Sequence, residues 1–180
     1  MKLRLLFSCL LLACAPCLTL AQDSAPVASV AAVDLARYSG KWYEIAAYPM
    51  FFQRNCVGDT TAEYSPGEKG DIRVFNRCRT ASGFDEATGK ATVVEGSANS
   101  RLKVSFFWPF KADYWVLGLD PQYRWAVVGN PNRKYLWLLS RTPQLSAPLL
   151  EAALASARDQ GFDLGQLHYT AQSAAPASVQ

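Results

Sequence analysis

Eight short runs rich in β-branched and aromatic residues, each bounded by turn signals, most constrain the fold of this 180-residue chain. The runs cover residues 41–48, 60–65, 71–77, 90–98, 101–106, 113–119, 125–128 and 135–140. The segments between them are short and carry Gly, Pro, Asn and Ser, which favour turns. Strands joined by such short connections cannot form a parallel sheet. The pattern therefore predicts an all-β antiparallel meander, as a sandwich or an eight-stranded up-and-down β-barrel.

One helix is expected after the eighth strand. Ser146 can cap its start, Pro148 suits its first turn and Gly161 can end it. Its apolar residues recur at helical spacing, and they are Leu149, Leu150, Ala153, Leu154 and Ala157. We expect a C-terminal α-helix packed outside the barrel, followed by one short strand within 167–172.

The N-terminus has the form of an export signal. Lys2 and Arg4 precede a nine-residue apolar stretch, which is too short to span a bilayer. Signal-peptidase cleavage after Ala21 is one reading, and cleavage before a lipidated Cys14 is the other. We prefer the first, because the second leaves an apolar tether. The expected divisions are a signal peptide (1–21), a flexible leader or tether (22–33), a folded domain (34–172) and a disordered tail (173–180).

Charge and motif content exclude several classes of function. The chain has 18 basic and 15 acidic residues, and cleavage after Ala21 leaves 16 against 15, with no basic run. We therefore expect no nucleic-acid partner. His168 is the one histidine, and no GxSxG, CxxC, HxxxH or glycine-rich phosphate motif is present. Glu44, Glu63 and Glu95 are expected to point outward or to be paired. The sequence thus predicts no catalytic site, no metal and no cofactor.

Two cysteines, Cys56 and Cys78, remain after export. A cysteine pair in an exported domain favours a disulfide, the alternative being two free buried thiols. If the turn in SPGEKG pairs Tyr64 with Gly70, the two cysteines lie directly opposite each other across the hairpin.

The interior of the barrel is the candidate binding site. Alternation along the strands assigns Tyr64, Val74, Val104, Phe106 and Trp137 to its inner wall. An eight-stranded barrel is wide enough to be filled or to hold one small ligand. Because the chain contains 5 Trp, 8 Tyr and 9 Phe, an apolar-ligand carrier is the favoured interpretation.

Three sequence blocks in order carry a family resemblance. Gly40-Lys41-Trp42 opens the first strand, Asp113-Tyr114 opens the sixth, and Arg141 follows the eighth. Together they resemble the lipocalin family over about residues 34–172. The stretches LKVSFFWPF, DYWVLGLDPQYRWAVVG and YLWLLSRTP are similar to its bacterial members.

This resemblance implies a fold and a function. In lipocalins the block tryptophan closes the bottom of a calyx and the late arginine packs on it, roles that fall to Trp42 and Arg141. Tyr114 and Trp125 join the ligand-binding wall by the same resemblance. The implied activity is to bind and carry fatty acids or lysophospholipids in the periplasm or at the outer membrane. A tetrapyrrole or pigment carrier is the first alternative, and a lipocalin-type enzyme the second.

The open end of the barrel is expected to be rich in aromatics. The loops after the first, third, fifth and seventh strands share this end, and they contain YPMFFQRN, TASGFDEATG, FFWPFKAD and GNPNRK. Their large apolar residues are Met50, Phe51, Phe52, Phe107, Trp108 and Phe110. If exposed, they would form a contact for a membrane surface or for a second copy in a homodimer; otherwise they fold inward and cap the barrel. Arg54, Lys111 and Arg133 are expected to meet a lipid phosphate or carboxylate.

Overall fold

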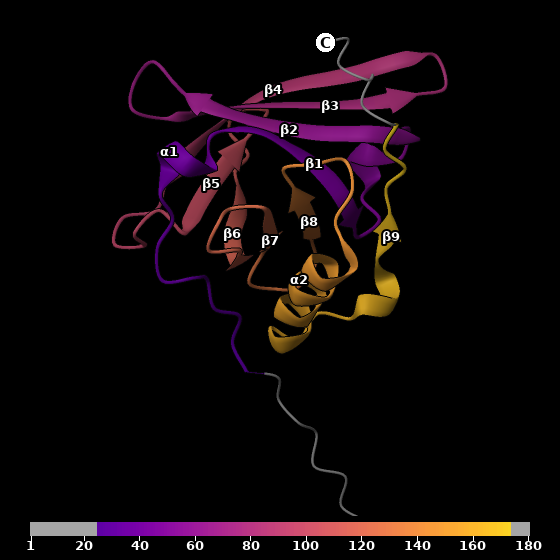
Figure 1. Cartoon of the computed structure of the whole chain (residues 1–180). Helices are drawn as coiled ribbons and strands as arrows, with labels where there is room; N and C mark the ends of the chain where they lie inside the picture. Colours follow the sequence, from indigo (N-terminus) through magenta and orange to yellow (C-terminus); the bar gives the residue numbers. More distant parts are fainter. Residues whose placement is uncertain (1–24, 174–180) are drawn as a thin grey trace, which may run out of the picture.

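A single antiparallel sheet closes into a barrel in the computed structural model, which describes residues 25–173 (Figure 1). The strands are β1 (Gly40–Ala47), β2 (Gly58–Pro66), β3 (Ile72–Thr80), β4 (Gly83–Val93), β5 (Arg101–Ser105), β6 (Ala112–Leu119), β7 (Trp125–Gly129), β8 (Leu136–Ser140) and β9 (His168–Tyr169). Strands β2 to β8 pair in chain order, and β1 pairs with both β2 and β8. The predicted eight-stranded up-and-down barrel is confirmed, and β9, the short strand expected within 167–172, pairs with β1.

The hairpin of β3 and β4 is longer than the sequence predicts. Residues 83–89 read as a loop because of their glycines and aspartate, but they extend β4. The ladder runs without interruption from Thr80↔Gly83 to Ile72↔Ala91. Cross-strand contacts outweigh local propensity here. The guanidinium carbon of Arg77 on β3 lies 3.8 Å from the centre of the Phe84 ring on β4.

The Cys56–Cys78 disulfide is confirmed, with a Cα–Cα distance of 5.6 Å. The register used to predict it is wrong, since Tyr64 pairs with Val74 and not with Gly70. The turn between β2 and β3 follows the pair Pro66↔Ile72, and Cys56 precedes β2, which begins at Gly58. The disulfide therefore joins the loop after β1 to β3 and is not a directly opposed pair within the hairpin.

Helix α2 (Ala147–Asp159) packs against the outside of the barrel, as predicted (Figure 1). Ala153 and Ala157 are fully buried in that contact. Ser146 occupies the N-cap position, although its side chain makes no capping hydrogen bond. Gly161 has a φ of 75° and donates its N–H to the carbonyl oxygen of Arg158, which ends the helix as expected.

The chain before the barrel is packed rather than free from residue 25 onward. Val27 and Val33 are buried. The N–H of Val30 donates to the carbonyl oxygen of Val116 at 2.8 Å, and that of Val33 donates to Ala98 at 3.0 Å. Residues 25–33 of the flexible leader expected for 22–33 are thus packed on the barrel, and residues 22–24 lie outside the described residues. The predicted signal peptide (1–21), with Cys14, and residues 174–180 lie outside the described residues.

Alternation along the strands separates two apolar clusters. The inner cluster lies on the inward face of the barrel wall and includes Trp42, Tyr64, Val74, Leu102, Val104, Val128 and Leu139. The outer cluster lies between the wall and α2 and includes Ile45, Leu117, Val127, Leu136, Leu138 and Phe162. Both faces of β8 are apolar because one face is directed toward the calyx and the other toward α2.

Candidate functional site: the calyx and its rim

The closed end of the calyx is built around Trp42. This side chain is fully buried, and its indole N–H donates to the carbonyl oxygen of Tyr38 at 2.8 Å. Tyr38 ends a short helix, α1 (Leu35–Tyr38), and the centre of its ring lies 5.0 Å from that of Trp42. The guanidinium carbon of Arg141 lies 3.8 Å from the centre of the Trp42 ring system, and the group donates to two main-chain carbonyl oxygens at 2.9 and 2.5 Å. Gly40 enters β1 with a φ of 91°, which glycine adopts without strain.

Three tyrosines meet on the calyx side of this floor. The hydroxyl of Tyr114 lies 2.7 Å from that of Tyr38 and 2.8 Å from that of Tyr64. Burial raises the pKa of Tyr64 to about 12 and raises the pKa values of Tyr38 and Tyr114 well above their usual range. Sequence reasoning placed Tyr64 and Tyr114 in the wall but missed Tyr38, because it lies outside every strand.

Most of the expected wall residues face the interior. Val74 and Val104 belong to the inner cluster, and Phe106 packs against it. Phe106 lies over Gly89, where an added Cβ would come within 2.8 Å of its ring. Trp137 packs against both clusters and is only partly buried.

Trp125 does not line the calyx. It belongs to the outer cluster with Val127, whereas Ala126 and Val128 of the same strand face inward. Both faces of β7 are apolar, so alternation gives no direction, and the resemblance assigned the wrong one. The space beside Gly118, under α2, holds part of the Trp125 ring.

Five large aromatics are exposed on the loops of the open end. Phe51, Phe52, Phe107, Trp108 and Phe110 are between 55% and 90% exposed. The first two lie in the short helix η1 (Phe51–Gln53), and the others follow β5. Met50 is buried in the outer cluster, so it does not belong to this set. We call these five side chains the aromatic rim.

The three expected cations differ in their surroundings. Lys111 and Arg54 are exposed on the same loops as the aromatic rim. Arg133 instead donates to the carbonyl oxygen of Gln160 at 2.8 Å and to that of Ala25. Because its guanidinium ties the β7–β8 loop to the end of α2, its expected role at a ligand headgroup is corrected.

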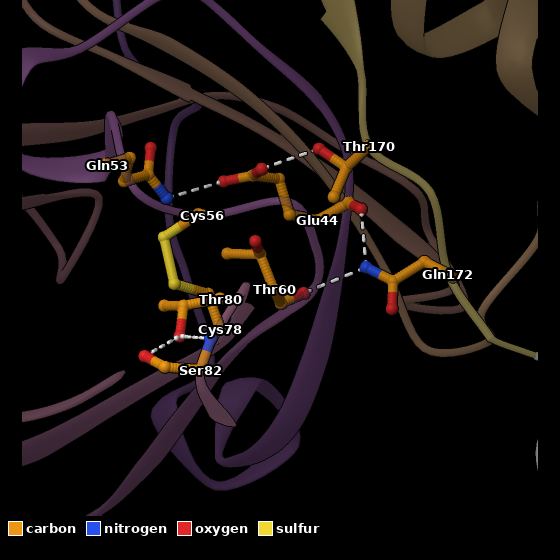
Figure 2. The surroundings of a disulfide bond; sticks show 9 residues. All are labelled: Glu44, Gln53, Cys56, Thr60, Cys78, Thr80, Ser82, Thr170 and Gln172. Carbon is orange, nitrogen blue, oxygen red and sulfur yellow. Dashed lines mark hydrogen bonds between the residues drawn. A yellow bond between two sulfur atoms is a disulfide. The ribbon is translucent and has the colours of Figure 1, made fainter. Parts of the chain in front are cut away.

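The buried carboxylate of Glu44 lies near the Cys56–Cys78 disulfide (Figure 2). Glu44 accepts from the side-chain amide of Gln53 at 3.0 Å and from the hydroxyl of Thr170 at 2.6 Å. Burial raises its pKa. The amide of Gln172 joins β1 to β2 by donating to the carbonyl oxygens of Glu44 and Thr60. The sequence led us to expect that this carboxylate points outward or is paired. Its hydrogen bond to Thr170 could not be predicted, because that residue lies far away in the sequence. Glu63 and Glu95 are exposed, as expected.

A cavity of about 600 Å³ adjoins this network. It is bounded by β1, by the loop between β1 and β2 that contains Cys56, and by residues 168–171. His168 is exposed at its edge. Within residues 25–173, no three His, Cys, Asp or Glu side chains are grouped so as to hold a metal ion. The same part of the chain contains no helix long and apolar enough to cross a membrane.

A closed eight-stranded barrel with a plugged floor and an apolar interior is the architecture of calyx proteins that hold one small ligand. Comparison with known proteins gives its family: residues 33–172 match the lipocalin-like domain, and the chain belongs to the lipocalin family. It is 40% identical to the outer membrane lipoprotein Blc of Vibrio cholerae, over 87% of this chain and 91% of the relative. It is 37% identical to temperature-induced lipocalin-1 of Arabidopsis thaliana, over 82% and 83%.

Among solved structures, insecticyanin from the tobacco hornworm Manduca sexta matches with a TM-score of 0.68 and 19% identity, covering 86% of this chain and 87% of that one. This likeness supports the fold. The predicted resemblance to bacterial lipocalins is confirmed by the Blc relatives. Family membership supports a role in binding and carrying a small ligand rather than catalysing a reaction.

Proposed function

We propose that this protein is an exported lipid carrier that holds a fatty acid or lysophospholipid in its calyx and exchanges it at the outer membrane. The observation that carries the proposal is the aromatic rim, which lies on two loops at the open end of a barrel with an apolar interior. An exposed apolar cluster of this size is typical of a membrane or protein contact. The names of the Blc relatives support the outer membrane as the site of action.

The apolar residues of the inner cluster suit an acyl chain. Burying a methylene contributes about 0.8 kcal/mol, so a 16-carbon chain contributes on the order of 12 kcal/mol before the costs of association and ordering. Lys111 and Arg54 lie beside the rim, where they can pair with the phosphate or carboxylate of a ligand whose head remains at the mouth.

Mass spectrometry of lipids released from the natively purified protein tests the ligand class. Fatty acids or lysophospholipids in stoichiometric amount are expected, whereas a chromophore that absorbs visible light would favour the pigment-carrier alternative. In titrations with a fatty acid, Trp137→Ala should weaken binding, and Tyr169→Ala, which alters an exposed side chain on β9, should not. Equal affinity in a folded Trp137→Ala variant would contradict its place in the binding wall.

Vesicle sedimentation tests the rim. The double variant Phe52→Ser/Trp108→Ser should lose most binding to anionic phospholipid vesicles while its circular dichroism is unchanged. Val93→Ser is the matched control, because Val93 is exposed at the opposite end of the barrel. If the double variant instead binds vesicles normally but changes its mass in solution from dimer to monomer, the rim is a homodimer interface.

A further inference from the structure

The tyrosine cluster at the base of the calyx has more protons than hydrogen bonds. Tyr38 comes from α1, Tyr64 from β2 and Tyr114 from β6. Their three hydroxyls supply three protons, and the two contacts between them use two. Whichever way the bonds run, one O–H of the cluster remains available. Among residues 25–173, these two contacts are the hydrogen bonds that the hydroxyls make.

The cluster stays protonated at physiological pH. Burial is the main cause of the raised pKa in all three tyrosines. The remaining proton is therefore a permanent donor. The same desolvation disfavours a carboxylate at this depth, because a charged group would lose its hydration there as well.

A second unpaired polar group lies on the adjoining strand. The side-chain oxygen of Asn76 is the one buried side-chain nitrogen or oxygen without a hydrogen-bond partner in the described part of the chain. Asn76 shares the inward face of β3 with Val74, which pairs with Tyr64. Because β3 runs toward the open end, this acceptor lies one inward position nearer the mouth than the donor cluster.

We propose that the calyx contains an internal polar site that takes an uncharged oxygen group, above all a hydroxyl, on an otherwise apolar ligand. The inference rests on the proposed carrier function and narrows its ligand class to lipids with a buried hydroxyl or carbonyl. A hydroxyl can accept from the tyrosine cluster and can also donate to an acceptor such as Asn76. A carbonyl can only accept, and a methylene leaves both protein groups unpaired.

The test compares 1-dodecanol with dodecane in the wild type and in the triple variant Tyr38→Phe/Tyr64→Phe/Tyr114→Phe. All three changes are needed, because removing either end tyrosine still leaves one unused proton. Replacing every member by a ring of the same shape leaves no orphaned hydroxyl, so the variant is expected to fold. Affinities are measured by displacement of a fluorescent fatty-acid analogue, with Tyr169→Phe as the control for an exposed tyrosine.

The ratio of the dodecane Kd to the dodecanol Kd should fall about fivefold to tenfold in the triple variant and remain unchanged in the control. An unchanged ratio in the triple variant would overturn the inference and leave the carrier function intact. Failure of the fatty-acid analogue to bind the wild type would contradict the carrier function itself.

A second measurement needs no variant. Bound 2-dodecanone labelled with ¹³C at its carbonyl should show a lower carbonyl stretching frequency in the wild type than in liquid dodecane, because a donor O–H weakens the carbonyl bond. A frequency equal to that in dodecane would refute a hydrogen bond to the ligand.

Discussion

Removing the disulfide should destabilise the barrel by about 3 kcal/mol without changing its fold. The bond closes a loop with a sequence separation of 22 residues. The chain-entropy relation gives about 11 cal/mol/K for such a loop, or about 3.4 kcal/mol at 25 °C. The suitable variant is Cys56→Ser/Cys78→Ala, since Cys78 is buried and a hydroxyl there would lack a partner, whereas Cys56 is partly exposed.

Urea unfolding followed by tryptophan fluorescence measures this effect. The wild type in reducing agent should match the double variant, because both lack the cross-link and retain the other contacts. At about 2–4 °C per kcal/mol for a chain of this size, the melting temperature should fall by about 10 °C. A loss below about 1 kcal/mol in both samples would refute the loop-entropy argument. A variant much less stable than the reduced wild type would show that packing at Cys78 dominates.

Three further perturbations test individual contacts. Arg141→Ala should lower the free energy of unfolding by about 2–3 kcal/mol, because it removes the stacking on Trp42 and two hydrogen bonds from a charged donor; an unchanged melting temperature would contradict this. Gly89→Ala should displace Phe106 from the calyx wall and alter fatty-acid affinity several-fold, at a stability cost of about 1–3 kcal/mol, and wild-type affinity in a fluorescence titration would argue against the wall assignment. Burial raises the pKa of Glu44 above its ordinary 4.5, so wild-type stability should decrease as pH rises from about 4.5 through the folded-state value. Glu44→Gln should remove that decrease, and an identical pH profile in urea unfolding would show that another group causes it.

The antiparallel meander was predictable because the turn-forming residues between the strands are a local sequence signal. Turn residues separate the runs, and each run is too short and too β-branched to be a helix. The β3–β4 hairpin escaped this logic, since Gly83 and Gly89 read as turn residues in isolation. Gly89 instead makes room for the Phe106 ring. The sequence alone does not show that Gly89 and Phe106 are in contact.

Alternation predicts the calyx wall only where one face of a strand differs from the other. Val104 lies between Lys103 and Ser105, and its orientation follows directly. On β7 both faces are apolar, because one meets the calyx and the other meets α2, and Trp125 was placed on the wrong side. Packing of a helix on a barrel therefore removes the signal at the strands that it covers.

The polar features of the site were the least predictable, and they bear most directly on selectivity. Tyr38, Tyr64 and Tyr114 are far apart in the sequence, and no spacing rule relates a residue on α1 to residues on two strands. An apolar wall discriminates between ligands mainly by size, at about 1–3 kcal/mol per methylene, whereas a site with an unpaired buried donor rejects ligands that leave it unpaired. Affinity and selectivity thus arise from different parts of the calyx. The aliphatic and aromatic wall determines which chain length binds best, and the tyrosine cluster determines which oxygen-bearing chains are preferred. Shortening the ligand should therefore weaken binding equally in the wild type and in the triple phenylalanine variant, while removing its hydroxyl should weaken binding more in the wild type than in that variant.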